Sequence, residues 1–163
     1  MYVHNKTSPP GGPFKPYFGL SGKTPLSSSG NPLRYNNYNS YLQLLLDEHI
    51  SPDVAVGLPR RNRKAVVRGM VEWEDGSFLG QEDSACLREA AVQKLTLVTY
   101  DRRTIPPLLK TWAEEGLHYA GVIFIDEKTI SPADIAGLIQ SLGILVKEAR
   151  EWDWTDRICF LRR

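Results

Sequence analysis

Residues 41–58, YLQLLLDEHISPDVAVGL, decide the fold of this chain. They begin with a nearly unbroken apolar run, which is typical of a strand buried on both faces inside a parallel sheet. The run ends at Asp47 and Glu48, and a helix is expected soon afterwards, because Ser51 is a good N-cap and Pro52 suits the first helical position. In open α/β sheets the ligand crevice lies beyond the carboxyl ends of the strands, so this acidic turn is a candidate site.

Two more apolar runs repeat this arrangement. They are LTLVT at 95–99 and GVIFI at 121–125, and an aspartate follows each of them closely. The spacing also predicts a strand at 65–67, a loop or small hairpin over 70–80, helices over 81–95, 106–116 and 135–149, and an edge strand at 157–161. Strands that alternate with helices in this way imply right-handed crossovers and a parallel sheet covered on both faces.

The N-terminal part has a different composition. Residues 1–41 contain six of the eleven prolines, five of the thirteen glycines and no acidic residue. Such a stretch buries too little apolar surface to offset its ordering entropy, so we predict a disordered N-terminal extension and a domain over 42–163. Aromatic residues interleave with basic ones here, which leaves open a nucleic-acid-binding arm beside a plain unstructured extension.

Charge and cysteine content restrict the classes of protein. The extension carries +4, whereas the remaining 16 basic and 19 acidic residues give the domain −3, which disfavours a dedicated DNA-binding protein. Cys86 and Cys159 alone make neither a zinc site nor a disulfide scaffold, so we expect two reduced thiols. The sequence contains no apolar run of about 18 residues and no secretory signal, which predicts a soluble, cytoplasmic protein without a membrane partner.

Acidic residues mark the candidate chemistry. Asp47, Asp101 and Asp126 each follow a predicted strand, and Asp83 lies at a predicted helix start. Parallel strands end at one edge of the sheet, where such carboxylates converge and repel unless protons or a cation neutralise them. An all-oxygen site suits Mg²⁺ or Mn²⁺. The simpler alternative is that each acid only caps a loop or a helix.

Four segments together resemble the PIN-like domains, relatives of the PIN-domain ribonucleases that act as toxins of toxin–antitoxin modules. They are LLLDEHISPDVAVGL (44–58), EDSACLREAA (82–91), LTLVTYDRRTIPPLLKTWAEEG (95–116) and HYAGVIFID (118–126). The resemblance covers about residues 42–161. It implies a three-layer α/β/α fold with a central, mostly parallel sheet of about four to five strands, and a Mg²⁺ or Mn²⁺ centre that cleaves RNA. It also implies an antitoxin protein and a homodimer as partners.

The resemblance carries over to individual residues. Asp47 matches the aspartate after the first strand of these domains, Asp83 the acid at the helix start, and Asp101 the aspartate that ends the next matching strand. These three are therefore the expected catalytic and metal-binding acids. Glu48 and Glu82 are the expected auxiliary acids.

The chain departs from the PIN pattern at two positions. A further acid is common near the position of Arg103, and an Asn or Ser is common near that of His49. The missing acid leaves two expectations open, namely one metal ion in place of two, or a weakened or absent nuclease activity. Arg61, Arg102 and Arg103 are the candidate contacts to substrate phosphates.

The sequence therefore predicts a metal-dependent ribonuclease, and the resemblance implies that it is of the toxin type. A non-catalytic PIN-like domain that binds RNA or another protein is the alternative. A receiver-type phosphoacceptor domain also places acids at strand ends, but it needs a lysine after a late strand, and Lys128 after Asp126 fits this requirement poorly.

Overall fold

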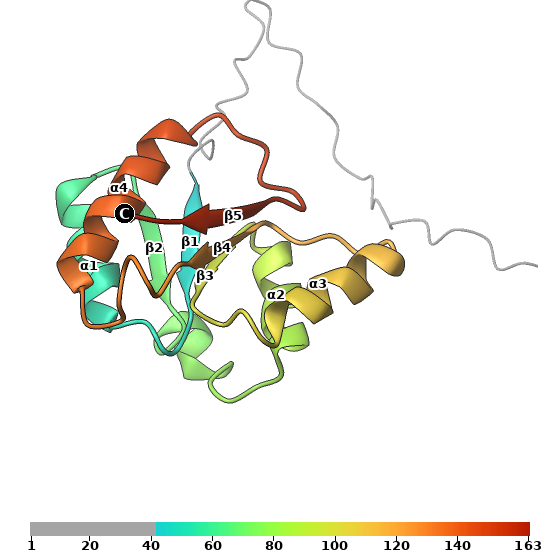
Figure 1. Cartoon of the computed structure of the whole chain (residues 1–163). Coiled ribbons are helices and arrows are strands. Elements are labelled where there is room, and N and C mark those ends of the chain that lie inside the picture. The colour runs from blue at the N-terminus through green and yellow to red at the C-terminus, as the bar shows by residue number, and fades with distance from the viewer. Residues whose placement is uncertain (1–41) are drawn as a thin grey trace, which may run out of the picture. The chain divides into compact units, whose positions relative to one another are not determined.

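Five parallel strands form the sheet of the described chain (Figure 1). The computed structural model describes residues 42–163, so the predicted disorder of residues 1–41 lies outside it. The strands are β1 (Gln43–Leu46), β2 (Val66–Gly69), β3 (Thr96–Thr99), β4 (Val122–Ile125) and β5 (Ile158–Leu161). The helices are α1 (Pro52–Arg61), α2 (Asp83–Val92), α3 (Ile105–Glu114) and α4 (Ile135–Glu148), with a short 3₁₀ segment, η1 (Trp73–Gly76).

The strand order β2-β1-β3-β4-β5 creates a switch point between β1 and β3. The chain leaves β1 through α1 toward β2, and then returns past β1 to form β3. The connections that follow β1 and β3 therefore run in opposite directions. Ligands of open α/β sheets bind at such a point, beyond the carboxyl ends of the strands.

Helices cover both faces of the sheet, which confirms the predicted three-layer α/β/α architecture (Figure 1). Helices α1 and α4 pack on one face and α2 and α3 on the other. Side chains alternate along each strand, so that successive residues pack into the hydrophobic cores on opposite faces of the sheet. Leu44, Leu46, Val98, Ile123 and Ile125 belong to the first, and Leu45, Leu97, Val122 and Phe124 to the second. Burial on both faces explains the continuous apolar runs.

Side chains cap the first turns of α1 and α4. Ser51 caps α1 as predicted and accepts a 3.3 Å hydrogen bond from the backbone N–H of Asp53. The last helix, predicted over 135–149, is α4, and Asp134 caps it, because its Oδ1 accepts from the backbone N–H of Gly137 at 2.9 Å. Gly137 allows this cap, since a Cβ there would collide with the Asp134 carboxylate.

The segment predicted as a loop or small hairpin over residues 70–80 contains the η1 turn and no strand. Trp73 holds it in place, since its indole is buried and stacks on Phe78 with ring centroids 4.6 Å apart. Its Nε1 also donates a 3.1 Å hydrogen bond to Gln93 Oε1 beyond α2. The turn is therefore anchored by an aromatic side chain rather than by strand pairing.

Two further predictions concern the thiols and the membrane. Cys86 and Cys159 are both free, as expected, with Cys86 buried and Cys159 half-buried. Between residues 42 and 163, no helix has the length and apolar character needed to cross a membrane.

Candidate functional site

A narrow cleft of about 60 Å³ opens at the switch point. Asp47, Asp83 and Asp101 all line it, although they come from three separate segments of the chain. Its other lining residues include Glu48, His49, Met70, Phe78, Gly80, Gln81, Cys86, Leu97 and Ile105. Pockets that enclose small molecules span roughly 300–1,000 Å³, so this cleft suits an ion and the atoms around one phosphate better than an enclosed ligand.

Thr99 links two of the aspartates at the end of β3. Its side chain is fully buried, and its Oγ1 donates a 2.5 Å hydrogen bond to Asp47 Oδ2. The same oxygen accepts a 2.9 Å hydrogen bond from the backbone N–H of Asp101. One hydroxyl group therefore fixes the Asp47 carboxylate and the chain at Asp101, and it leaves Oδ1 of Asp47 unused by this bond.

Thr104 links the other pair of aspartates. Its Oγ1 lies 2.7 Å from Asp83 Oδ2 and 2.5 Å from Asp101 Oδ2. A hydroxyl group carries only one hydrogen, so it cannot fully satisfy both carboxylates at once. Two carboxylates held this close favour a shared proton or a bound cation.

The backbone around Asp101 stabilises its ionised form. Its Oδ1 accepts hydrogen bonds from the N–H groups of Arg103 at 2.6 Å and of Thr104 at 2.9 Å. Desolvation by burial raises the pKa of Asp101, but the hydrogen bonds from Thr104 and Arg103 and the Arg103 charge together outweigh it, so the pKa lies below its ordinary value. Asp101 is therefore an anionic oxygen donor at neutral pH.

Two other titratable side chains line the cleft. Burial, together with the charges of Asp83 and Asp47, raises the pKa of the Cys86 thiol, so Cys86 stays protonated and is a poor metal ligand or nucleophile. His49 is largely exposed, with its Nδ1 3.9 Å from Asp47 Oδ1 and its Nε2 3.9 Å from Glu48 Oε1. It lies at the mouth of the cleft.

Of the other acids named from the sequence, one lines the cleft and two do not. Glu48 lines the cleft, whereas Glu82 is exposed, does not line it, and makes no side-chain cap bond at the start of α2. Asp126, to which the resemblance assigns no role, also lies outside the cleft lining. It pairs instead with Arg162, at 3.4 Å, and accepts from the N–H of Lys128.

The three candidate phosphate contacts lie at different distances from the cleft. Arg102 and Arg103 are exposed and directly follow Asp101. Arg61 ends α1 near the opposite edge of the sheet, because β2 begins a few residues later in register with the start of β1. The ten-residue helix α1 is about 15 Å long, so it separates Arg61 from the cleft.

Metal binding fits the chemistry of these donors. Asp83, Asp101 and Oδ1 of Asp47 offer only oxygen atoms, the donors that Mg²⁺ and Mn²⁺ prefer. In the part of the chain that the structure describes, no three His, Cys, Asp or Glu side chains lie close enough together to hold a metal ion. The three aspartates would hold such an ion only if their side chains came closer together than they lie here.

Sequence reasoning missed both threonines. Thr99 has one local signal, a hydroxyl at the end of a fully buried strand, where a buried polar group needs a partner. Thr104 precedes α3 and resembles an ordinary N-cap, but it makes no side-chain cap bond, because its hydroxyl contacts the two carboxylates instead.

Comparisons of the chain with protein-family models, with curated proteins and with solved structures found no match. The similarity to PIN-like domains therefore stays a prediction.

Proposed function

We propose that the protein is a metal-dependent ribonuclease that hydrolyses RNA phosphodiester bonds at the cleft beside β1 and β3. One observation carries this proposal: Asp47, Asp83 and Asp101, which lie far apart in the sequence, line a single cleft at the switch point. The concentration of negative charge in the cleft supports the proposal, because four acidic residues line it in a domain whose other charges nearly balance. These residues are Asp47, Glu48, Asp83 and Asp101.

Each residue has a role in this proposal. Asp83, Asp101 and Oδ1 of Asp47 hold Mg²⁺ or Mn²⁺, and Thr99 and Thr104 orient these carboxylates. When bound, such an ion supplies charge stabilisation at the scissile phosphate and makes a water molecule easier to deprotonate. The lowered pKa of Asp101 keeps this ligand ionised over the whole neutral range.

Residues at the rim complete the site. Glu48 provides a more exposed carboxylate at the cleft mouth, with 37% of its side chain accessible, and serves as the auxiliary acid. Arg103 contacts a neighbouring phosphate, since its exposed side chain lies beside Asp101. A toxin paired with an antitoxin protein is the biological setting that the family resemblance favours.

Two alternatives make different demands on the cleft. A non-catalytic PIN-like domain that binds RNA or protein would use the same acids without cleavage. A receiver-type phosphoacceptor would need a lysine near its aspartate, and no lysine among the described residues lines the cleft. The acidic lining therefore favours metal-dependent hydrolysis over phosphoryl transfer to Asp101.

Metal-dependent stabilisation and cleavage test the proposal together. Thermal unfolding is followed with and without Mn²⁺ or Mg²⁺, and a fluorescent single-stranded RNA reports cleavage. Metal at 100 times its dissociation constant should add about 2.7 kcal/mol to the free energy of unfolding. Asp101→Asn should remove most of this gain and the cleavage, because the ion loses an anionic ligand.

Asp126→Asn is the matched control, because this aspartate also follows a strand but is paired with Arg162 outside the cleft. It should keep both the metal response and the cleavage. Stabilisation by metal without any cleavage in the parent protein would favour the non-catalytic alternative. An unchanged metal response in Asp101→Asn would overturn the metal site.

A further inference from the structure

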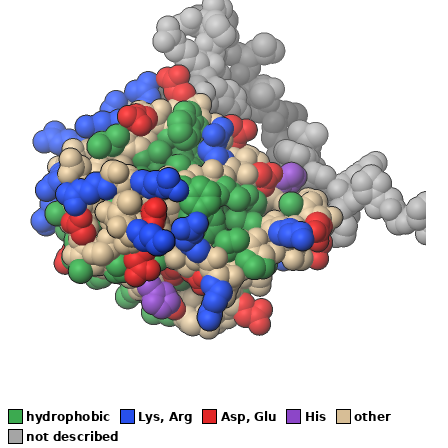
Figure 2. All heavy atoms as spheres, viewed as in Figure 1, with side chains coloured by type: hydrophobic (Ala, Val, Ile, Leu, Met, Phe, Trp, Pro, Cys, Tyr) green, Lys and Arg blue, Asp and Glu red, His purple; other side chains and the backbone are tan. Residues whose placement is uncertain are grey.

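An aromatic side chain stands exposed on the last strand. Phe160 has 52% of its surface accessible, and Ile158, two residues earlier on the same strand, has 45%. β5 is the edge of the sheet and pairs only with β4 in the part of the chain that the structure describes. Figure 2 shows hydrophobic side chains gathered near the centre of this face, with Lys and Arg side chains beside them.

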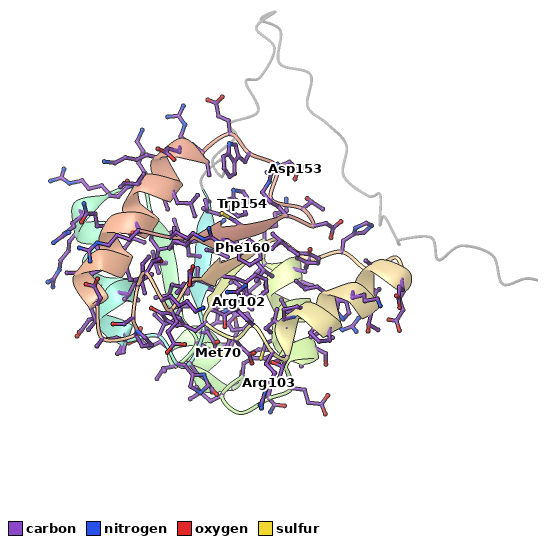
Figure 3. The ribbon with its side chains drawn as sticks, viewed as in Figure 1. Met70, Arg102, Arg103, Asp153, Trp154 and Phe160 are labelled. Atoms are coloured by element: carbon purple, nitrogen blue, oxygen red, sulfur yellow. The ribbon has the colours of Figure 1, made fainter. Side chains whose placement is uncertain are left out.

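The Phe160 ring is held in a defined orientation. Its inner side stacks on the buried Phe124 ring, with centroids 5.6 Å apart and an interplanar angle of 26°. The guanidinium carbon of Arg102 lies 5.3 Å from the centroid of the Phe160 ring (Figure 3). Two planar groups, one of them cationic, therefore lie together on an exposed surface.

Chain connectivity places this pair beside the acidic cleft. Arg102 directly follows Asp101, and adjacent Cα atoms are about 3.8 Å apart. Phe160 lies in register with Phe124, one position before the carboxyl end of β4, so the ring is near the cleft edge of the sheet. Figure 3 labels Arg102 between Phe160 and Arg103 in this view.

Arg102 differs from its basic neighbours in its partners. Arg162 pairs with Asp126 and Arg163 with Asp134, whereas no ion pair involves Arg102 among residues 42–163. Within the described residues, the charge of Arg102 therefore has no carboxylate partner. Stacking on an aromatic ring leaves the guanidinium edge, with its hydrogen-bond donors, open to a ligand.

The geometry points to a subsite in which the guanidinium of Arg102, held over the Phe160 ring, stacks a base of single-stranded RNA next to the scissile phosphate. This inference rests on the proposed ribonuclease function and adds the residues that position the substrate. Unstacked RNA bases bind to aromatic side chains and to guanidinium planes, and any base can do so because every base has a π-face. The subsite therefore selects single strands without selecting sequence.

Charge favours RNA over a second copy of the chain on this surface. Arg157 and Arg162 flank β5, and pairing two β5 edges in opposite directions would bring Arg157 of each copy beside Arg162 of the other, whose charge Asp126 offsets only in part. An anionic RNA backbone instead gains from the same arginines. A protein strand added at the edge remains the competing occupant that the experiment must exclude.

Fluorescence anisotropy with a labelled six-nucleotide uridine RNA tests the subsite, in EDTA so that binding is separated from cleavage. Phe160→Leu keeps an apolar side chain but removes the aromatic ring that holds Arg102 in place, so the affinity should fall about 5-fold to 150-fold, the range for one stacked base. Phe160→Trp should retain the parental affinity. Ile158→Ala, on the same strand and similarly exposed, should change the affinity less than twofold.

A second RNA with abasic positions makes the test specific. Removal of the stacked base should weaken binding to the parent by the same factor, with no further loss in Phe160→Leu. Equal losses in Phe160→Leu and Ile158→Ala would overturn the inference and assign the edge to general apolar contact. Parental binding by Phe160→Leu, with cleavage intact in Mg²⁺, would overturn the subsite while leaving the ribonuclease proposal standing.

Failure of the proposed function gives a different result. A parent that binds the RNA without cleaving it overturns the ribonuclease proposal and leaves the subsite to be judged by the Phe160→Leu affinity. A parent that does not bind the RNA overturns the subsite. Sedimentation of the parent and Phe160→Leu then decides whether the patch joins copies of the chain, in which case the substitution lowers the measured mass. Thermal unfolding of every variant confirms that each has folded.

Discussion

The hydroxyl group of Thr99 donates a 2.5 Å hydrogen bond to Oδ2 of Asp47 across the boundary between β3 and β1. The sheet register makes this contact, since Leu46 pairs with Val98 and the N–H of Asp47 donates to the carbonyl of Val98 at 3.0 Å. The side chain that orients one candidate ligand is thus part of the sheet itself. Fold and site are coupled at this point.

Thr99→Val tests that coupling. The substitution keeps the shape but leaves Asp47 Oδ2 and the N–H of Asp101 without this partner, which should cost about 2 kcal/mol in the free energy of unfolding. Urea denaturation measures the loss. Thr96→Val is the control, because Thr96 is also buried on β3 but donates to a neutral carbonyl, that of Ala120, and should lose only about 1 kcal/mol. Equal losses of unfolding free energy in the two variants would show that the hydrogen bond to Asp47 stabilises the protein no more than one to a neutral carbonyl.

The lowered pKa of Asp101 predicts a pH dependence of stability. Its ordinary pKa is 3.8, and its folded pKa is lower, so the unfolded chain binds the proton more tightly. The stabilising contribution of the carboxylate is therefore complete above about pH 5 and is lost as the pH falls through the folded pKa. The difference in unfolding free energy between the parent and Asp101→Asn should decrease over that window, as measured by urea denaturation between pH 3 and 7. A difference that grows toward low pH would contradict the assignment.

The sequence predicted the sheet, and the approach of two aspartates follows from the sheet for a simple geometric reason. Parallel strands end at one edge, so Asp47 and Asp101, 54 residues apart, had to approach each other once both runs were strands in one sheet. Asp83 followed from the family pattern. Apolar runs as strong as these leave few alternative arrangements.

The features that could not be predicted depend on how the strands and helices are placed in the folded protein. Thr99 and Thr104 become partners of the aspartates only through tertiary contacts, which no local pattern encodes. The sequence indicated an edge strand at 157–161, but not that the side chain of Phe160 on it would be exposed beside the buried Phe124. Arg61 belonged to a basic cluster in the sequence, but α1 carries it away from the cleft.

Asp83 and Glu82 offer a matched pair of neighbouring acids, of which only Asp83 lines the cleft. Asp83→Asn should weaken Mn²⁺ binding by at least the tenfold to hundredfold that loss of an outer-shell partner costs. Glu82→Gln removes the same charge one residue earlier and should leave the affinity unchanged. Isothermal titration of both variants measures the effect. A similar loss of Mn²⁺ affinity in the two variants would mean that these acids attract the ion only through their negative charge and not as direct ligands.

Arg103 and Arg61 distinguish a local contact from general attraction of RNA. Arg103 is exposed beside Asp101, whereas Arg61 lies at the far end of α1, and both carry the same charge. Arg103→Ala should weaken binding of single-stranded RNA and reduce the slope of log affinity against log salt by roughly 0.7, the value for one phosphate contact on a single strand. Arg61→Ala should leave the slope unchanged, because its side chain lies about a helix length from the cleft. Anisotropy titrations between low and moderate salt measure both slopes. If Arg61→Ala lowers the slope as much as Arg103→Ala, the RNA follows the α1 face and the cleft is not its main binding site.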